Sequence, residues 1–244
     1  MVGIPQQRGG GAGASAERMG RQQRDAVRAR QHARARWALP AAAVVGLVVA
    51  VLVGASGWLA LVLVVLLVAV AARRVYRPAG NSWTKGAEGE RRTAQMLIPL
   101  QRDGWSALHD RAVPGSKANV DHLLIGPAGA VMVDSKFWTS SKSRLRLDGG
   151  RLFYGRYDQT RTLQTAAWEA QQAARVLGVP VRAIVAVHGA TVPGGVLMLE
   201  GVTVVPAKRV PHIVRNFAPM PGFDPYRVQQ LVALAERGLP PHGG

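Results

Sequence analysis

The chain has 244 residues, of which 31 are Lys or Arg and 14 are Asp or Glu, so its net charge is +17 and its pI is about 11.6. This excess predicts a polyanionic partner. Nucleic acid and anionic lipid headgroups both qualify, because phosphate contacts need only dense positive charge. The absence of cysteine excludes disulfides, cysteine zinc sites and thiol nucleophiles. No glycine-rich loop follows a strand pattern, so no nucleotide cofactor is expected.

Residues 1–36 are rich in Gly, Ala, Gln and Arg and hold too few large apolar side chains to bury a core. This composition predicts a basic, disordered cytoplasmic tail. The stretch from Ala16 to Trp37 also has a pattern that allows a helix at a membrane surface, where its arginines would meet lipid headgroups or nucleic acid.

Residues 38–72 carry no charge, and one straight helix of that length would exceed the roughly 30 Å hydrocarbon core of a bilayer. The sequence GASG at 54–57 indicates a break, which predicts a transmembrane hairpin over 37–74 with helices near 39–53 and 58–72. Arginines flank both ends, so the positive-inside rule places both in the cytoplasm and predicts a multi-pass protein of the cell membrane with a cytoplasmic soluble domain. A single tilted span and a cleaved signal or interfacial segment are the alternatives.

A linker over 75–83 precedes a segment with helical periodicity at 85–100. Glu90 shares a face with Ala94 and Leu97, whereas Glu88 falls on the polar face with two arginines. Glu90 is therefore expected to point inward. The alternative role, a glutamate that favours the helix dipole, suits Glu88 better.

Residues 119–136 form two apolar, β-branched runs around a GPAG turn signal at 126–129, which predicts an antiparallel β-hairpin. Residues whose numbers sum to 255 then face each other, so Asp121 lies opposite Asp134, with Lys136 on the same face. Opposed carboxylates destabilise a sheet unless a divalent cation offsets their charge. The hairpin therefore predicts a metal site. In the alternative, one aspartate is solvated at an edge and the register slips.

Basic and aromatic residues alternate after this hairpin, a pattern that suits a nucleic-acid groove. The contact candidates are Lys142, Arg144, Arg146 and Arg151. The alternative is a solvated hairpin whose apolar residues cover the core. Of six histidines only His122 adjoins the expected metal site, and strand alternation points it to the opposite face; His109, His188 and His212 are scattered, so no histidine metal site is expected.

The remaining elements are a helix at 159–178, a buried strand at 181–189, a short strand with a turn or helix after Val202, and an amphipathic helix from Asp224. Helix, antiparallel strands, helix and strand in this order predict an α/β fold with a mixed sheet flanked by helices. We place the domain at 84–206 and a C-terminal helical extension and tail at 207–244.

Several motifs occur in order: GAEGE, LHD, NVDH, a GP turn, VDSKFW, DGGRL and a glutamine-bearing helix. Over roughly 84–206 the chain resembles NERD (nuclease-related domain) proteins, a branch of the PD-(D/E)XK nuclease superfamily with a restriction-endonuclease-like fold. The resemblance implies that Glu90 matches the glutamate of the first helix, Asp121 the PD-type aspartate, and Asp134 with Lys136 the (D/E)xK pair. Gln164 and Trp168 match a QxxxY-like element more loosely, because a helical aromatic is often a core residue.

The resemblance implies a metal-dependent nuclease that hydrolyses phosphodiester bonds in DNA. Asp121, Asp134 and Glu90 would hold Mg²⁺ or Mn²⁺, which prefer oxygen ligands. The competing function is a catalytically inactive module that binds nucleic acid or a protein partner at the membrane, since fold does not guarantee activity. A third is a lipid-surface scaffold with no role in nucleic-acid binding.

Overall fold

The computed structural model describes residues 14–54, 56–76, 82–139 and 144–242. The chain divides into two compact units, Arg18–Ser82 and a unit that contains Trp83–Gly244.

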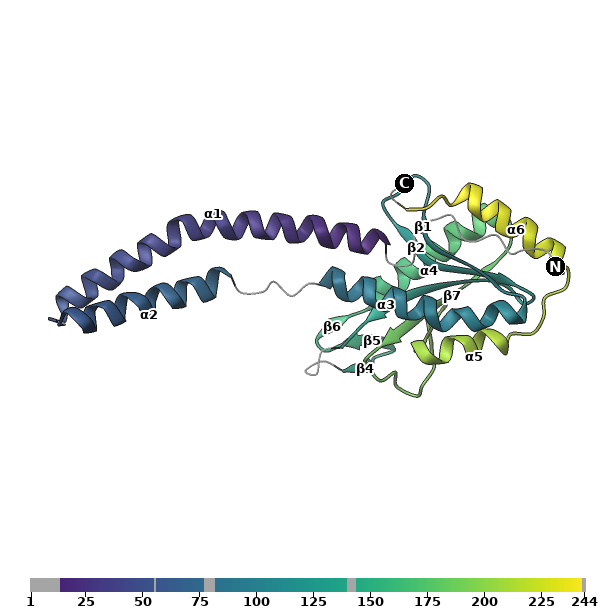
Figure 1. Cartoon of the computed structure of the whole chain (residues 1–244). Helices are drawn as coiled ribbons and strands as arrows, with labels where there is room; N and C mark the ends of the chain where they lie inside the picture. Colours follow the sequence, from purple (N-terminus) through teal and green to yellow (C-terminus); the bar gives the residue numbers. More distant parts are fainter. Residues whose placement is uncertain (1–13, 55, 77–81, 140–143, 243–244) are drawn as a thin grey trace. The chain divides into compact units, whose positions relative to one another are not determined.

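The first unit is a pair of helices, α1 (Ala14–Leu52) and α2 (Gly57–Val75), drawn in Figure 1. The chain reverses after Gly54, which has a φ of +63° that glycine adopts without strain. A Cβ at Gly46 would lie 2.9 Å from the Cα of Val64, so the two helix backbones approach closely there. Small residues permit such packing between apolar helices. The predicted break at 54–57 is confirmed.

Of the two alternatives for the basic tail, disorder and a helix, the structure has the helix from Ala14 onward, because α1 already begins there. Ala, Arg and Gln are strong helix formers, so the tail continues the apolar helix that follows it. Residues 1–13 lie outside the described part of the chain. Gln31–Leu52 and Gly57–Val75 are long and apolar enough to cross a membrane.

The second unit alternates helices and strands in the predicted order. Its helices are α3 (Ser82–Leu97), α4 (Thr160–Leu177), α5 (Val210–Arg215) and α6 (Pro225–Gly238), with short 3₁₀ turns η1 (Ile98–Asp103) and η2 (Ala207–Arg209). Its strands are β1 (Ser106–Ala112), β2 (Asn119–Gly126), β3 (Gly129–Phe137), β4 (Leu145–Asp148), β5 (Arg151–Tyr154), β6 (Tyr157–Asp158), β7 (Val181–His188), β8 (Leu197–Leu199) and β9 (Val202–Pro206).

The main sheet has six strands in the order β1-β2-β3-β7-β9-β8, and β4, β5 and β6 form a separate small sheet. Strands β1, β2 and β3 are antiparallel, whereas β7 runs parallel to β3 and β9 runs parallel to β7. Helix α4 supplies the crossover that a parallel pair requires. The structure thus confirms a mixed sheet flanked by helices.

Helices cover both faces of this sheet. Figure 1 shows α3 and α5 on one face and α4 and α6 on the other. Odd-numbered residues of β3 such as Val131 and Val133 pack in the cluster that includes Leu97 and Val210. Even-numbered residues such as Met132 pack with α4 and α6. The two faces of β3 therefore carry two separate cores.

Candidate functional site

The site lies where β2 and β3 separate. Their ladder runs from Gly126–Gly129 to His122–Val133, which confirms the predicted register, and it stops there. One residue further, Asp121 Oδ2 accepts a hydrogen bond from the Ser135 backbone N–H at 2.9 Å. The Asp121 side chain thus accepts a backbone hydrogen bond from β3 beyond the end of the ladder, and it lies beside the segment that carries Asp134.

Asp134 and Lys136 lie two residues apart on β3, so both point to the face covered by α4. The Lys136 ammonium donates a hydrogen bond to Asp134 Oδ1 at 2.6 Å. Asp134 is 5% exposed, whereas Lys136 is partly exposed. The pair therefore has a buried acid and a cation that reaches the surface.

Glu90 enters from α3. It is buried, whereas Glu88 is partly exposed and forms ion pairs with Arg91 at 2.8 Å and Arg92 at 2.6 Å. The predicted division of this helix into an inward and a polar face is confirmed. Helix α3 lies close to the end of β3 at Gly89. A Cβ atom at this position would lie 3.3 Å from the Phe137 side chain.

Asp110 on β1 belongs to the same cluster and was missed in the sequence. It has a φ of +50° and takes no place in the β1–β2 ladder, between the pairs His109–His122 and Arg111–Val120. Asn119 Nδ2 donates to Asp110 Oδ1 at 3.2 Å and to Asp121 Oδ1 at a longer 3.5 Å. The register places Asp110 level with Asp121, and the motif LHD was the available signal.

Helix α4 contributes Glu169, which the sequence reading also missed. Glu169 is 8% exposed and falls in the apolar stripe that α4 packs against the core. Gln164, predicted as an accessory residue on this helix, is exposed, and Trp168 is 38% exposed. A glutamate inside an apolar stripe was the signal for Glu169. The accessory role of Gln164 stays a prediction.

The carboxylates raise one another's pKa. Burial, together with the charges of Asp110 and Asp134, raises the pKa of Glu90 to about 7. Burial and Asp134 raise the pKa of Glu169 to about 8. The pKa of Asp121 also lies well above its usual value, through burial and the charges of Glu90 and Asp134.

The charged form of Lys136 is favoured, in contrast to the charged forms of the carboxylates. Burial opposes its charge, but Asp134 and Asp121 outweigh that effect, so its pKa is raised and the ammonium stays protonated at neutral pH. One cation is thus set among several acids that repel one another.

The clustered carboxylates have the chemistry that a divalent cation requires. Two buried carboxylate oxygens, Glu90 Oε2 and Asp134 Oδ2, have no hydrogen-bond partner among the described residues. Buried acids without partners are costly, and oxygen donors are the ligands that Mg²⁺ and Mn²⁺ prefer. As they stand, no three His, Asp or Glu side chains in the described part of the chain converge as a metal-binding group.

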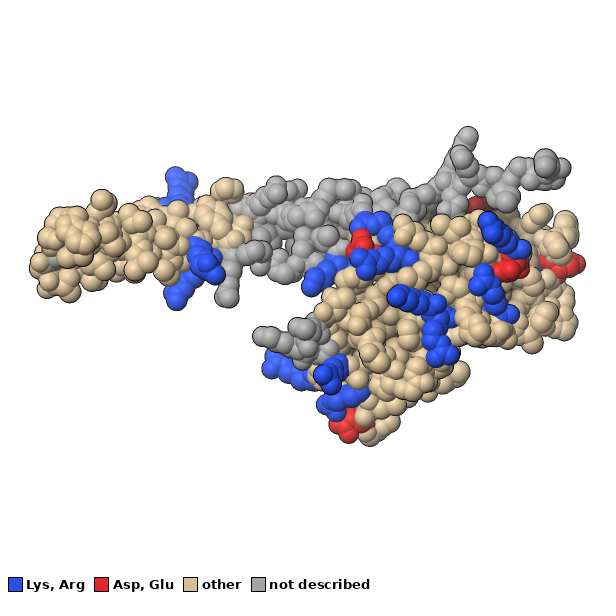
Figure 2. Space-filling view, turned by 60° about the horizontal axis from the view of Figure 1, so that its bottom comes forward, with Lys and Arg blue, Asp and Glu red and all other residues tan. Residues whose placement is uncertain are grey.

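The predicted basic contact residues lie on and beside the small sheet. Arg146 pairs with Asp148 at 2.6 Å and covers the Phe153 ring at 4.5 Å, and Arg151 pairs with Asp158 at 2.6 Å. Arg144 is exposed, and Lys142 lies outside the described residues. Figure 2 shows basic side chains spread over this face of the domain with few acidic ones among them.

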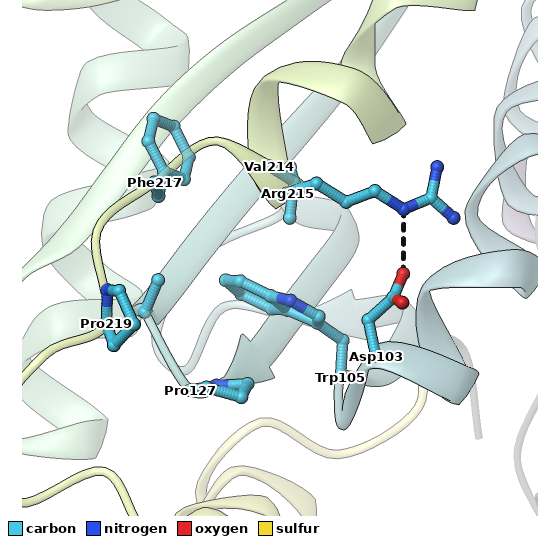
Figure 3. Close-up of a pocket in the computed structure, with 8 residues that line it drawn as sticks. Asp103, Trp105, Pro127, Val214, Arg215, Phe217 and Pro219 are labelled. Carbon is cyan, nitrogen blue, oxygen red and sulfur yellow. Dashed lines mark hydrogen bonds and ion pairs between the residues drawn. The ribbon is translucent and has the colours of Figure 1, made fainter.

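A pocket lies at the other end of the hairpin, beside the turn (Figure 3). It has a volume of about 310 Å³, and Arg215 and Asp103 form an ion pair of 2.7 Å at its rim. Its lining residues are Asp103, Trp105, Pro127, Ala128, Val214, Arg215, Phe217 and Pro219. The lining contains none of the clustered carboxylates, so this pocket is separate from the candidate site.

A mixed sheet with carboxylates from three strands and two helices around one lysine defines an α/β domain with an acidic centre. Residues 85–188 match the family model NERD, the nuclease-related domain, which confirms over this segment the resemblance seen in the sequence. The match ends at β7, while the same sheet continues through β9 and β8. No curated protein and no solved structure gives a significant match to the chain.

Proposed function

We propose that this protein is a metal-dependent nuclease that hydrolyses phosphodiester bonds in DNA. The observation that carries the proposal is the cluster of Glu90, Asp121 and Asp134 around Lys136, in which two buried carboxylate oxygens find no hydrogen-bond partner among the residues that the structure describes. The cluster lies inside the segment that matches the nuclease-related domain. Such a set of acids weakens the metal-free fold and gains from a cation.

Asp121, Asp134 and Glu90 would hold Mg²⁺ or Mn²⁺. Bound there, the ion supplies Lewis acidity and an activated water. The Ser135 N–H orients Asp121, and Asp134 orients Lys136, at the distances given above. Because Lys136 is protonated, its role is to donate hydrogen bonds to the phosphate and to stabilise negative charge there, rather than to remove a proton.

DNA is the substrate class that the charge favours, with a net charge of +17 for the chain. Arg144, Arg146 and Arg151 are the described contact candidates. The last two each hold an acid that a phosphate would replace. The aromatic ring under Arg146 keeps that guanidinium at the surface of the small sheet.

The two apolar helices would anchor the domain in the cell membrane as two spans. Arginines flank both ends of the apolar segment. Arg73 and Arg74 lie in the last turn of α2, and further arginines lie in the basic first part of α1. By the positive-inside rule, they favour the cytoplasmic side for both ends. Anionic lipid headgroups would meet these arginines.

The proposal is tested with the full chain in detergent micelles and labelled single- and double-stranded DNA, with Mg²⁺, with Mn²⁺ and with EDTA. Asp134→Asn and Lys136→Ala should each lower the cleavage rate by roughly 10³-fold, because each removes several kcal/mol of charge stabilisation. Glu88→Gln is the matched control, since it removes a carboxylate at the surface of the same domain and should leave cleavage intact.

Full activity in either site variant would contradict the proposed site. Salt-sensitive DNA binding without cleavage by the unmodified chain would favour a binding module at the membrane. Binding to anionic liposomes without DNA binding at low salt would favour a lipid-surface scaffold.

A further inference from the structure

Five polar side chains form a continuous hydrogen-bonded chain across the sheet, on the face opposite Asp134 and Lys136. His109 Nδ1 lies 2.9 Å from His122 Nδ1, and His122 Nε2 lies 3.2 Å from Ser135 Oγ. Ser135 Oγ then donates to Thr93 Oγ1 at 2.8 Å, and Thr93 Oγ1 lies 2.8 Å from His188 Nε2. His109 and His188, which the sequence analysis called scattered, are therefore brought together with His122 by β1, β2 and β7, whereas His212 lies apart on α5.

The chain of bonds is unusual because it is buried. Thr93 and His122 are fully buried, and Ser135 and His188 are each 7% exposed. His109 is partly buried. Buried polar groups without partners are costly, so the hydrogen bonds within this set stabilise its four buried members. The network connects α3, β1, β2, β3 and β7.

Four of the five members lie close in the sequence to a residue of the acidic cluster, and His188 on β7 is the exception. His109 precedes Asp110, His122 follows Asp121, and Ser135 separates Asp134 from Lys136. Thr93 follows Glu90 by three residues, about one helical turn. Since neighbouring residues of a strand point to opposite faces, the network lies behind the backbone that presents the acids.

The hydrogen bonds of the network all donate in the same order, from His109 towards His188. Ser135 gives its only hydroxyl proton to Thr93, so its oxygen accepts from His122 Nε2–H. A neutral imidazole carries one ring proton, so His122 Nδ1 accepts from His109 Nδ1–H. Thr93 in turn donates to His188 Nε2. This arrangement satisfies every polar atom named and holds Ser135, whose backbone N–H binds Asp121.

We propose that the network of His109, His122, Ser135, Thr93 and His188 is a positioning device that sets the geometry of the acidic cluster for catalysis. It ties α3, which carries Glu90, to the strand that carries Asp134 and Lys136. Groups that hold metal ligands in place commonly change affinity or activity by about 10- to 100-fold when they are removed. This proposal rests on the proposed function of the site.

The test uses the full chain in detergent micelles and compares Thr93→Val with Thr93→Ser. Valine keeps the shape and removes the hydroxyl, whereas serine keeps the hydroxyl. Thr93→Val should lower kcat for DNA cleavage roughly 10- to 100-fold with KM nearly unchanged and should weaken Mn²⁺ binding, followed by electron paramagnetic resonance. Thr93→Ser should restore both. Thr203→Val on β9 is the control for the same change outside the network.

If Thr93→Val does not fold, Ser135→Ala takes its place, because it removes only the hydroxyl and keeps the N–H that binds Asp121. Unchanged kcat and Mn²⁺ affinity in the variant that folds would overturn the positioning role while leaving the nuclease in place. Equal losses in Thr93→Val and Thr93→Ser would also overturn it. A wild-type chain that neither cleaves DNA nor binds Mn²⁺ would overturn the proposed function, and the positioning role with it.

Discussion

The two ends of the β2–β3 hairpin are built from the same two strands and are packed in opposite ways. At the turn, Gly126 and Gly129 close the ladder, and a Cβ at Gly126 would overlap the ring of Trp105. At the open end the ladder stops, and two carboxylate oxygens remain without hydrogen-bond partners among the described residues. The hairpin is tightly packed at one end, and at the other it lies beside buried carboxylates that the proposed function assigns to a metal ion.

The difference indicates where function costs stability. Close packing at the turn stabilises the fold directly. The crowded acids at the open end do the reverse in the absence of metal, because each raises the pKa of its neighbours. Variants at the two ends should therefore change stability in opposite directions.

The largest effect on stability is expected from Glu90→Gln. The pKa of Glu90 in the folded chain, about 7, lies above the usual 4.5. The contribution of Glu90 to the free energy of unfolding is therefore fully present below pH 4.5 and is lost as pH rises through about 7. The loss is at most about 3 kcal/mol, since one pKa unit corresponds to about 1.4 kcal/mol. In EDTA, Glu90→Gln should remove this part of the pH dependence of thermal unfolding between pH 4.5 and 8.

Glu88→Gln is the control on the same helix and should keep the wild-type pH dependence. If Glu90→Gln and the wild type lose stability equally over this range, the open end does not carry the strain described here. Added Mg²⁺ should stabilise the wild type more at pH 8 than at pH 5, because the acids must ionise to bind it.

A smaller and opposite effect is expected at the turn. Gly126→Ala should lower the free energy of unfolding by about 1–3 kcal/mol, because the added methyl group meets the Trp105 ring in a packed core. Chemical unfolding followed by tryptophan fluorescence measures the loss. Gly86→Ala is the control, since nothing lies within 4 Å of its Cβ position. An unchanged free energy of unfolding in Gly126→Ala would show that the turn end of the hairpin is not tightly packed.

The smallest effect is expected from Asp121→Asn in EDTA. The amide keeps an acceptor for the Ser135 N–H and removes one of the clustered charges, so the metal-free fold should gain at most about 1 kcal/mol. Asp148→Asn, at an exposed position on β4, should not show this gain. Strong destabilisation by Asp121→Asn would mean that this carboxylate is structural.

The sequence predicted what local pattern determines. The turn signal and the alternation of β2 and β3 were enough to give the register, and helical periodicity was enough to separate Glu90 from Glu88. Both inferences need only neighbours along the chain.

The residues that were missed depend on distant partners. Asp110 enters the cluster through a backbone with positive φ, which an aspartate in a strand pattern does not reveal. Glu169 reaches it because α4 packs on the face of β3 that carries Asp134. The helix over 14–36 was only the second alternative for the tail, because its composition, read without the helix that follows, favours disorder.

The most direct test of the central claim is a Mn²⁺ titration of the full chain in detergent micelles at pH 7.5, in buffers of different ionisation enthalpy. Saturable binding with release of protons is expected, because Glu90 and Asp121 have raised pKa values in the metal-free state. Asp134→Asn should abolish this binding, and Asp148→Asn should not. No saturable binding, or equal binding by Asp134→Asn, would contradict a metal site at the acidic cluster.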